Sequence, residues 1–179
     1  MRASQASAPR IVDLFDREIG EGIFAPEDVL DSSIALAAFD QGALVGAAIA
    51  EICTGRTVVD IFPDNQRWIA ELLPFKPREK VGELQMLAVE PGARSRGIGR
   101  ALLKARIDRL EAQGVKRLIA FAWTSEQGGC HAGPLLEEAG LRPLVTVERF
   151  YEAETLENGV GCPVCGHDGC RCAAVIYIR

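Results

Sequence analysis

A strand that runs through a glycine-rich loop into a helix is the feature that most constrains this sequence. Residues 83–89 are mostly apolar and predict a strand, a Pro-Gly turn follows, and the apolar residues of 97–113 recur at helical spacing. Free N–H groups at the start of a helix point outward and favour an anion. Gly97 and Gly99 let a phosphate approach the backbone closely because they carry no Cβ. The segment therefore predicts a site for a pyrophosphate.

Three anion-binding loop patterns compete for this segment. A Walker A loop needs a lysine and a Ser/Thr where this chain has Ile98 and Gly99. A dinucleotide-binding fingerprint needs a third glycine where this chain has Leu102. The pattern R-x-x-G-x-G fits without exception, with Arg94, Gly97 and Gly99 in its fixed positions.

The stretch Arg94-Ser95-Arg96-Gly97-Ile98-Gly99 resembles the acyl-CoA pyrophosphate loop of the GNAT (general N-acetyltransferase) superfamily, and Met86 to Pro91 resembles that family's fourth strand. The resemblance is strong over residues 83–123 and loose over roughly 30–150. It implies that acetyl-CoA is the cosubstrate and that the strand and loop bind it. The residues implied to bind the cofactor are Leu87, Ala88, Val89, Arg94, Ser95, Arg96, Gly97, Ile98, Gly99 and Arg100.

The remaining pattern predicts an α/β (α+β) fold, with a GNAT-like mixed central sheet flanked by helices. We expect helices over residues 10–19, 97–113 and 132–139, and strands over 33–39, 44–53, 83–89, 118–123, 144–151 and 173–178. The length of 179 residues predicts one domain, 1–179, with a cysteine-rich zinc loop at 161–172 inserted between the last two strands.

Acyl transfer from a thioester to an amine needs a base, a proton donor for the thiolate and a donor for the oxyanion. Glu83, at the start of the key strand, is the first candidate for the base, and Glu51 on the preceding strand is the second. A solvated carboxylate at a strand start is the alternative for Glu83. Period-two alternation places Glu83 and Val89 on the same face of the strand.

The proton donor is a gap in this sequence. Many GNAT members carry a tyrosine four residues before the glycine that ends the last helix, and this chain has Leu136 there. His131 is a candidate by its ordinary pKa, with an exposed helix-cap histidine as the alternative. Ser125 and Cys130 follow the same strand, and Tyr151 is placed on the next one, outside the family motif.

Four of the six cysteines fall within eleven residues near the C-terminus, at Cys162, Cys165, Cys170 and Cys172. Four thiolates are the ligand set of a structural Zn²⁺ site, and such a site leaves no open position for catalysis. His167 could replace one cysteine, and disulfides are the alternative in an exported protein.

The net charge of −5 argues against a nucleic-acid partner, although six basic residues crowd 94–109 and suit the phosphates of CoA. No apolar signal segment or membrane span is present in the sequence, so we expect a cytoplasmic protein without a membrane partner. The sequence thus predicts an acetyltransferase that moves acetyl from acetyl-CoA to a primary amine, on a small molecule or a peptide, by direct attack. The family resemblance also allows a homodimer. The alternative function is a non-catalytic acyl-CoA-binding module whose zinc knuckle contacts a protein.

Overall fold

The computed structural model describes residues 1–125 and 129–179. The helices are α1 (Ala8–Glu18), α2 (Pro26–Asp31), α3 (Gly55–Asp60), α4 (Ile98–Ala112), α5 (Gly133–Glu138) and α6 (Glu152–Glu157), with 3₁₀ turns η1 (Asp64–Leu72) and η2 (Pro91–Ala93). The strands are β1 (Ile34–Asp40), β2 (Ala43–Thr54), β3 (Lys80–Leu84), β4 (Leu87–Val89), β5 (Arg117–Thr124), β6 (Arg142–Val147) and β7 (Ala173–Ile178). Within the described ranges, no helix is long and apolar enough to span a membrane.

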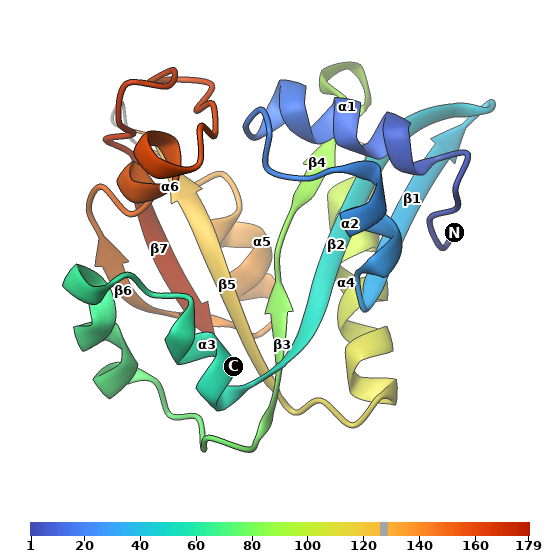
Figure 1. The fold of residues 1–179 in the computed structure, drawn as a ribbon. Coiled ribbons are helices and arrows are strands. Elements are labelled where there is room, and N and C mark those ends of the chain that lie inside the picture. Colours follow the sequence, from blue (N-terminus) through green and yellow to red (C-terminus); the bar gives the residue numbers. More distant parts are fainter. Residues whose placement is uncertain (126–128) are drawn as a thin grey trace.

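The strands form one mixed sheet in the order β1-β2-β3-β5-β7-β6, and β4 pairs with β2 alone (Figure 1). Among the described strands, only the β3–β5 pair is parallel, and the other pairs are antiparallel. The cysteine-rich segment lies in the connection between β6 and β7. The predicted fold class and the position of the cysteine loop are therefore confirmed.

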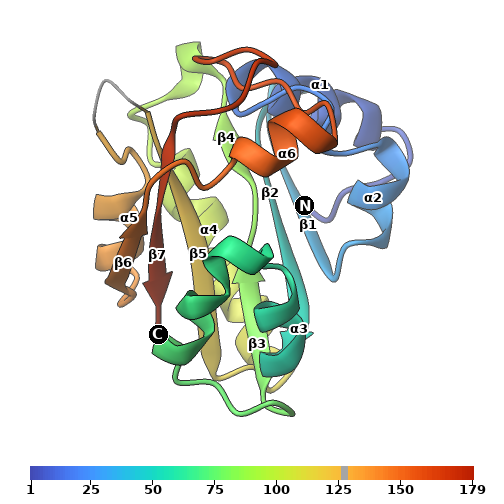
Figure 2. The same ribbon diagram turned by 60° about the vertical axis from the view of Figure 1, so that its left-hand side comes forward.

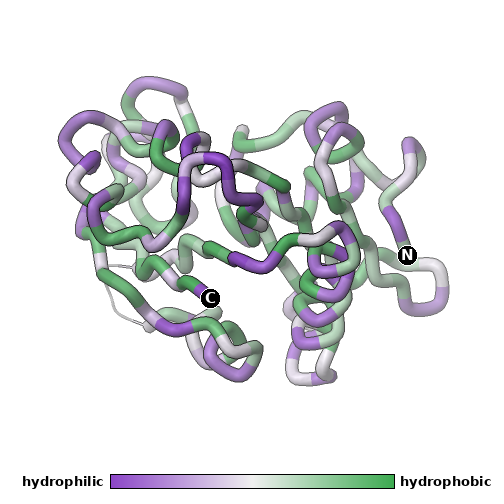
Figure 3. Tube along the Cα trace, turned by 90° about the horizontal axis from the view of Figure 1, so that it is seen from below, coloured by the Kyte–Doolittle hydropathy of each residue, from purple (hydrophilic) through white to green (hydrophobic). Residues whose placement is uncertain are grey.

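Helices cover both faces of this sheet (Figures 1 and 2). One face buries the apolar side of α4 together with Leu136 of α5. On the other face, α1 and α2 cover the half around β1 and β2, and α3 and η1 cover the half around β5, β6 and β7. The central segments of the chain are mostly hydrophobic and the outer turns mostly hydrophilic (Figure 3). The second face thus carries two separate cores, with β3 running between them.

A one-residue β-bulge divides the strand that the sequence predicts over 83–89 into β3 and β4. Glu51 lies opposite Glu83, whereas Ala47 lies opposite Ala88, so the register on β2 shifts by one residue between the two pairs. The shift reverses the alternation of faces. The prediction that Glu83 and Val89 share a face is wrong: Val89 lies near Gly99 of α4, and Glu83 points to the opposite face.

Arg106 fixes the backbone at this bulge. Its guanidinium Nη1 donates to the carbonyl oxygens of Ile49 at 2.7 Å and Met86 at 3.0 Å. The residue is 2% exposed, so it does not take part in the basic patch that the sequence suggests over 94–109. Burial lowers its pKa to about 9. A buried cation without a carboxylate partner is costly, and here its hydrogen bonds go to the carbonyls that the bulge displaces.

The chain differs from the predicted elements most clearly after β6. The strand predicted over 144–151 ends at Val147, and Tyr151 is the N-cap of α6 instead of a strand residue.

The apolar, β-branched stretch after residue 56 forms α3, because the Thr54 side chain accepts from the N–H of Thr57 at 3.2 Å and caps the helix. Tertiary burial of Val58 then favours the helix over its strand propensity.

Candidate functional site

An opening between β4 and β5 is the centre of the candidate site. The β3–β5 pairing ends at Leu84 and Ala120, and beyond that point β4 pairs only with β2 among the described strands. The N–H of Ile49 on β2 donates to the Met86 carbonyl, and the N–H of Glu90 donates back to β2. Because backbone groups alternate in an antiparallel pair, those of Leu87 and Val89 face the opening and those of Ala88 face β2.

The loop that follows β4 has the conformation that its glycine pattern requires. Gly97 is the N-cap of α4 with a φ of +79°, and Ser95 also has a positive φ of 59°. No side chain caps the start of α4, so its first N–H groups remain available to an anion. A Cβ placed on Gly97 would meet nothing within 4 Å, so the left-handed backbone, not crowding, selects glycine here.

Carboxylates neutralise the arginine side chains of this loop. Arg94 pairs with Glu18, Arg96 with Asp40 at 2.9 Å and Arg100 with Glu138 at 2.8 Å. All three arginines are more than half exposed, and exposed pairs of this kind contribute little and exchange easily. The sequence suggests a basic patch, and the structure shows that carboxylates offset the charge of these three arginines.

Glu83 lies on the face opposite α4, next to the opening. Burial raises the pKa of Glu83 above its ordinary value, and the nearby Glu51 carboxylate adds to the rise. The Cys53 thiol lies 3.7 Å from the Glu83 carboxylate and donates to it, which offsets part of that shift. Burial, followed by Glu83 itself, raises the pKa of Cys53 to about 12, so the thiol keeps its proton. A carboxylate whose pKa is raised toward neutrality suits a general base.

Glu51 lies directly across the sheet from Glu83 but is bound elsewhere. Its carboxylate accepts from the Ser33 hydroxyl at 2.6 Å and from the Ser33 N–H at 3.1 Å. Glu51 therefore influences Glu83 through its charge, while its own oxygens fix the start of β1.

Tyr151 lies at the β5 side of the same opening. Its hydroxyl donates to the Phe121 carbonyl at 3.4 Å, on the part of β5 beyond its pairing with β3. Its ring packs edge-on against Phe150, which stacks on Phe121 at 5.4 Å. Burial raises the pKa of Tyr151 above its ordinary value, with Glu154 adding to the rise. The hydroxyl thus stays protonated beside the opening. No motif marks this tyrosine, because the contact joins residues 30 positions apart.

Comparison with known proteins agrees with this arrangement. The model of the "Acetyltransferase (GNAT) family" matches residues 8–140. The chain belongs to the GNAT acetyltransferase family. A mycothiol acetyltransferase of Beutenbergia cavernae is 38% identical over 74 residues, which make up 41% of this chain and 24% of that protein. The similarity to this relative therefore covers only about a quarter of its length.

Solved structures share the GNAT fold over the whole chain. The ribosomal-protein-alanine N-acetyltransferase of Brucella melitensis has a TM-score of 0.64 at 19% identity, with 100% of this chain and 97% of that one covered. NAA60 of Arabidopsis thaliana, in complex with a bisubstrate analogue, has a TM-score of 0.68 at 15% identity, with 100% of this chain and 95% of that one covered. GphF, a GNAT-like decarboxylase in complex with isobutyryl-CoA, has a TM-score of 0.67 at 16% identity, with 100% of this chain and 97% of that one covered. At these identities the likeness shows the fold alone.

The other predicted donors lie outside the opening or in its periphery. His131 is exposed on the turn before α5. Its role as the proton donor stays a prediction. Leu136, at the position of the tyrosine in many GNAT members, is 5% exposed in the core under α4. Cys130 is partly buried near Tyr177, whose hydroxyl donates to Glu137 at 3.2 Å.

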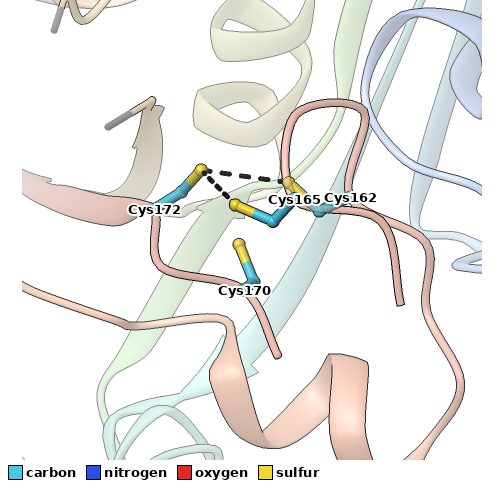
Figure 4. Close-up of side chains that lie close together, drawn as sticks. All are labelled: Cys162, Cys165, Cys170 and Cys172. Atoms are coloured by element: carbon cyan, nitrogen blue, oxygen red, sulfur yellow. Dashed lines mark hydrogen bonds between the residues drawn. The ribbon is translucent and has the colours of Figure 1, made fainter. Parts of the chain in front are cut away.

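The four clustered cysteines of this GNAT chain point their sulfur atoms at one another (Figure 4). All four sulfurs lie within 4.8 Å of each other, and Cys172 is 3.8 Å from Cys162 and 3.7 Å from Cys165. A disulfide needs sulfurs about 2.05 Å apart. Zn–S bonds of about 2.3 Å in a tetrahedron place their sulfurs roughly 3.8 Å apart, so the separations fit a shared metal. His167 turns away, with Nδ1 3.1 Å from the Gly159 carbonyl.

Proposed function

We propose that this protein transfers an acetyl group from acetyl-CoA to a primary amine by direct attack. The observation that carries the proposal is the arrangement around the bulge. On one face, the open edge of β4 leads into the left-handed glycine at the start of α4. On the other face of the same stretch of chain, Glu83 has a raised pKa. Donor and acceptor would therefore meet across one segment of backbone.

The donor would lie along β4 and the loop. The backbone groups of Leu87 and Val89 at the open edge suit the amide groups of pantetheine, as in strand addition to a sheet edge. The N–H groups at the start of α4 suit the pyrophosphate. One of the β4 N–H groups also supplies a donor for the oxyanion of the tetrahedral intermediate.

The residues on the amine face would move the protons. Glu83 accepts a proton from the attacking amine as the N–C bond forms. When the C–S bond breaks, the thiolate takes a proton from the Tyr151 hydroxyl, which is hydrogen-bonded to Phe121 at the β5 edge of the opening. Solvent then returns that proton to the tyrosine and removes the one held by Glu83. Tyr151 thus fills the role for which the sequence offers His131 and no family tyrosine.

The acceptor is a small molecule or a peptide with a primary amine. Glu51 lies opposite Glu83, and Glu154 also raises the pKa of Glu83 through its charge. This concentration of negative charge favours an amine that arrives as a cation.

Cys162, Cys165, Cys170 and Cys172 would hold one structural Zn²⁺. The sulfur separations match a tetrahedral thiolate site, and Cys170 and Cys172 are buried. Four thiolates saturate the metal, so the zinc takes no part in the chemistry of acetyl transfer.

The first test is the melting temperature with and without acetyl-CoA. A ligand that binds only the folded protein adds about 2.7 kcal/mol at a hundredfold excess over its Kd, so a clear rise is expected. Release of CoA thiol with a panel of amines then tests transfer. Binding without release by any amine would favour the non-catalytic module, and no thermal shift at millimolar acetyl-CoA would refute the proposal.

Two matched variants locate the binding site. Gly97 and Gly114 have φ values of +79° and +81°, and a Cβ on either would meet nothing within 4 Å. Gly97 is the N-cap of α4, and Gly114 follows its C-cap Gln113. Gly97→Asp and Gly114→Asp therefore introduce the same left-handed strain and the same added charge at opposite ends of the helix. Gly97→Asp should weaken acetyl-CoA binding at least tenfold by repelling the pyrophosphate, and Gly114→Asp should leave it unchanged. Equal effects of the two variants would contradict the assignment of the loop.

A further inference from the structure

The cysteine loop, residues 161–172, contacts two other segments of the chain. On one side it pairs with the connection between α1 and α2. The N–H of Glu21 donates to the Gly161 carbonyl at 2.9 Å, and the N–H of Gly161 donates to the Glu21 carbonyl at 2.9 Å. Figures 1 and 2 both show the loop beside this connection. Two residues 140 positions apart in sequence are thereby joined next to the first metal ligand, Cys162.

On its other side the loop holds α6. The N–H of Cys170 donates to the Thr155 hydroxyl at 2.8 Å, and Thr155 is 3% exposed. The N–H of Phe150 donates to the Cys172 carbonyl at 3.1 Å. Each bond joins a cysteine of the cluster to a residue near Tyr151. Phe150 lies directly before Tyr151, and Thr155 lies four residues after it. The position of the Tyr151 hydroxyl thus depends on the backbone of the cluster.

Further hydrogen bonds of the loop are local: Cys162 and Gly166 exchange two backbone bonds, and His167 Nδ1 lies 3.1 Å from the Gly159 carbonyl. Its exposed side chains include Val164, which is 43% exposed, and two of its glycines, Gly166 and Gly169, have positive φ values of 73° and 87°. A short connection of this kind cannot bury enough apolar surface to offset its conformational entropy. A metal that gathers four ligands supplies that free energy, because binding and ordering are then one event.

We propose that the zinc of the four-cysteine cluster clamps α6 and the α1–α2 connection together, and so maintains the amine side of the site while leaving acetyl-CoA binding independent of the metal. This inference rests on the proposed function for the identity of the amine side. The contacts that carry it, Glu21 with Gly161 and Cys170 with Thr155, involve neither β4 nor the loop before α4.

Metal removal from the full chain tests the clamp. The purified protein should contain about one zinc per chain, measured by elemental analysis, and chelation under reducing conditions should remove it. Amide hydrogen exchange at Glu21, Gly161 and Cys170 should then accelerate at least tenfold, while exchange on β2 stays unchanged. The affinity for acetyl-CoA should stay within twofold, and the KM of the best amine should rise at least tenfold.

A variant that keeps the metal separates the clamp from the stability of the fold. A Cβ on Gly161 would lie 3.3 Å from the Glu21 Cβ and 2.7 Å from Cε1 of His167, an exposed side chain that can rotate away. Gly161→Ala therefore crowds Glu21 and should weaken the pairing of the two segments. It should retain one zinc and normal acetyl-CoA affinity, yet show faster exchange at Glu21 and a raised KM for the amine. Val164→Ala, on an exposed side chain between two of the ligands, should match the wild type in every measurement.

The outcomes distinguish the two proposals. Absence of bound zinc, or unchanged exchange at Glu21 and Cys170 after zinc removal, would overturn the clamp. A tenfold loss of acetyl-CoA affinity on metal removal would overturn its independence from the donor side. Hydrogen exchange needs neither acetyl-CoA nor an amine, so if no amine is acetylated the proposed function fails while the exchange result still decides the clamp.

Discussion

The two sides of the opening are held in place by different means. The donor side is fixed by backbone geometry: a one-residue bulge, a left-handed glycine and a buried arginine that donates to two carbonyls. On the proposed amine side, a connection of 25 residues between β6 and β7 is hydrogen-bonded to α6 through Cys170 and to the α1–α2 connection through Gly161. The sheet contributes to both sides, because Glu83 lies on β3, but the segment around Tyr151 depends on the connection between β6 and β7.

This difference shows which half of such a site can vary. The pyrophosphate and pantetheine of CoA are the same for every acceptor, and a backbone surface that reads them needs no particular side chains beyond glycine. The amine differs between acceptors, and the cysteine loop between β6 and β7 can change its side chains without disturbing the sheet. The following predictions test whether the two sides are as separate as the contacts indicate.

The largest effect is expected at Glu83. Glu83→Gln should lower kcat with the best amine by roughly 10²- to 10⁴-fold, the range for loss of a general base. The pKa of Glu83 is raised in the fold, so the stability that this carboxyl contributes is lost as pH rises through that pKa. Glu83→Gln should therefore have a higher Tm than the wild type at pH 8, with unchanged acetyl-CoA affinity. A variant with full activity would exclude Glu83 as the base.

An intermediate effect is expected at Arg106, on the donor side. Arg106→Met removes the bonds to the Ile49 and Met86 carbonyls, and a hydrogen bond to a charged group contributes about 1.5–3 kcal/mol. Acetyl-CoA affinity, measured by calorimetry, should fall about tenfold because the β4 edge loses its position. Arg109→Met, on an exposed residue of the same helix, is the control. A change in the KM of the amine alone would break the division between the two sides.

The smallest effect is expected from Glu51→Gln. Glu51 raises the pKa of Glu83 through its charge, so the substitution should lower that pKa. Because only the ionised Glu83 accepts a proton, the rising limb of the kcat/KM profile should move to lower pH. The amide oxygen of glutamine still accepts from Ser33, which preserves the local structure. Glu157→Gln, on the exposed end of α6, should leave the profile in place. A limb that moves to higher pH would contradict the assignment.

The sequence shows the turn before α4 because its geometry demands particular residue types. A left-handed N-cap requires a residue without Cβ, so Gly97 is visible in the sequence. The four cysteines are visible for the same reason, since thiolates are the ligands that structural zinc takes. The family match over residues 8–140 confirms the resemblance on which the prediction of the loop depends.

The sequence does not reveal what depends on register and long-range contact. An apolar run from 83 to 89 contains no sign of an extra residue, so the bulge and the reversal of faces at Val89 were not predicted. Arg106 resembles its exposed neighbours in sequence, and only the packing of α4 on β2 shows that it is buried. The sequence predicts a strand that includes Tyr151, because Phe150 and Tyr151 extend the pattern past Val147, where the strand ends in the structure.

The bulge also limits how this segment can change over time. Before the bulge Glu83 points away from α4, and after it Leu87 and Val89 point toward Gly99 of α4. Substitutions between Glu83 and Val89 can adjust either surface separately. Loss or gain of a single residue there would exchange the two sets of side chains, presenting the base to the cofactor and apolar groups to the amine. We therefore expect related chains to vary in residue type within this segment while preserving its length.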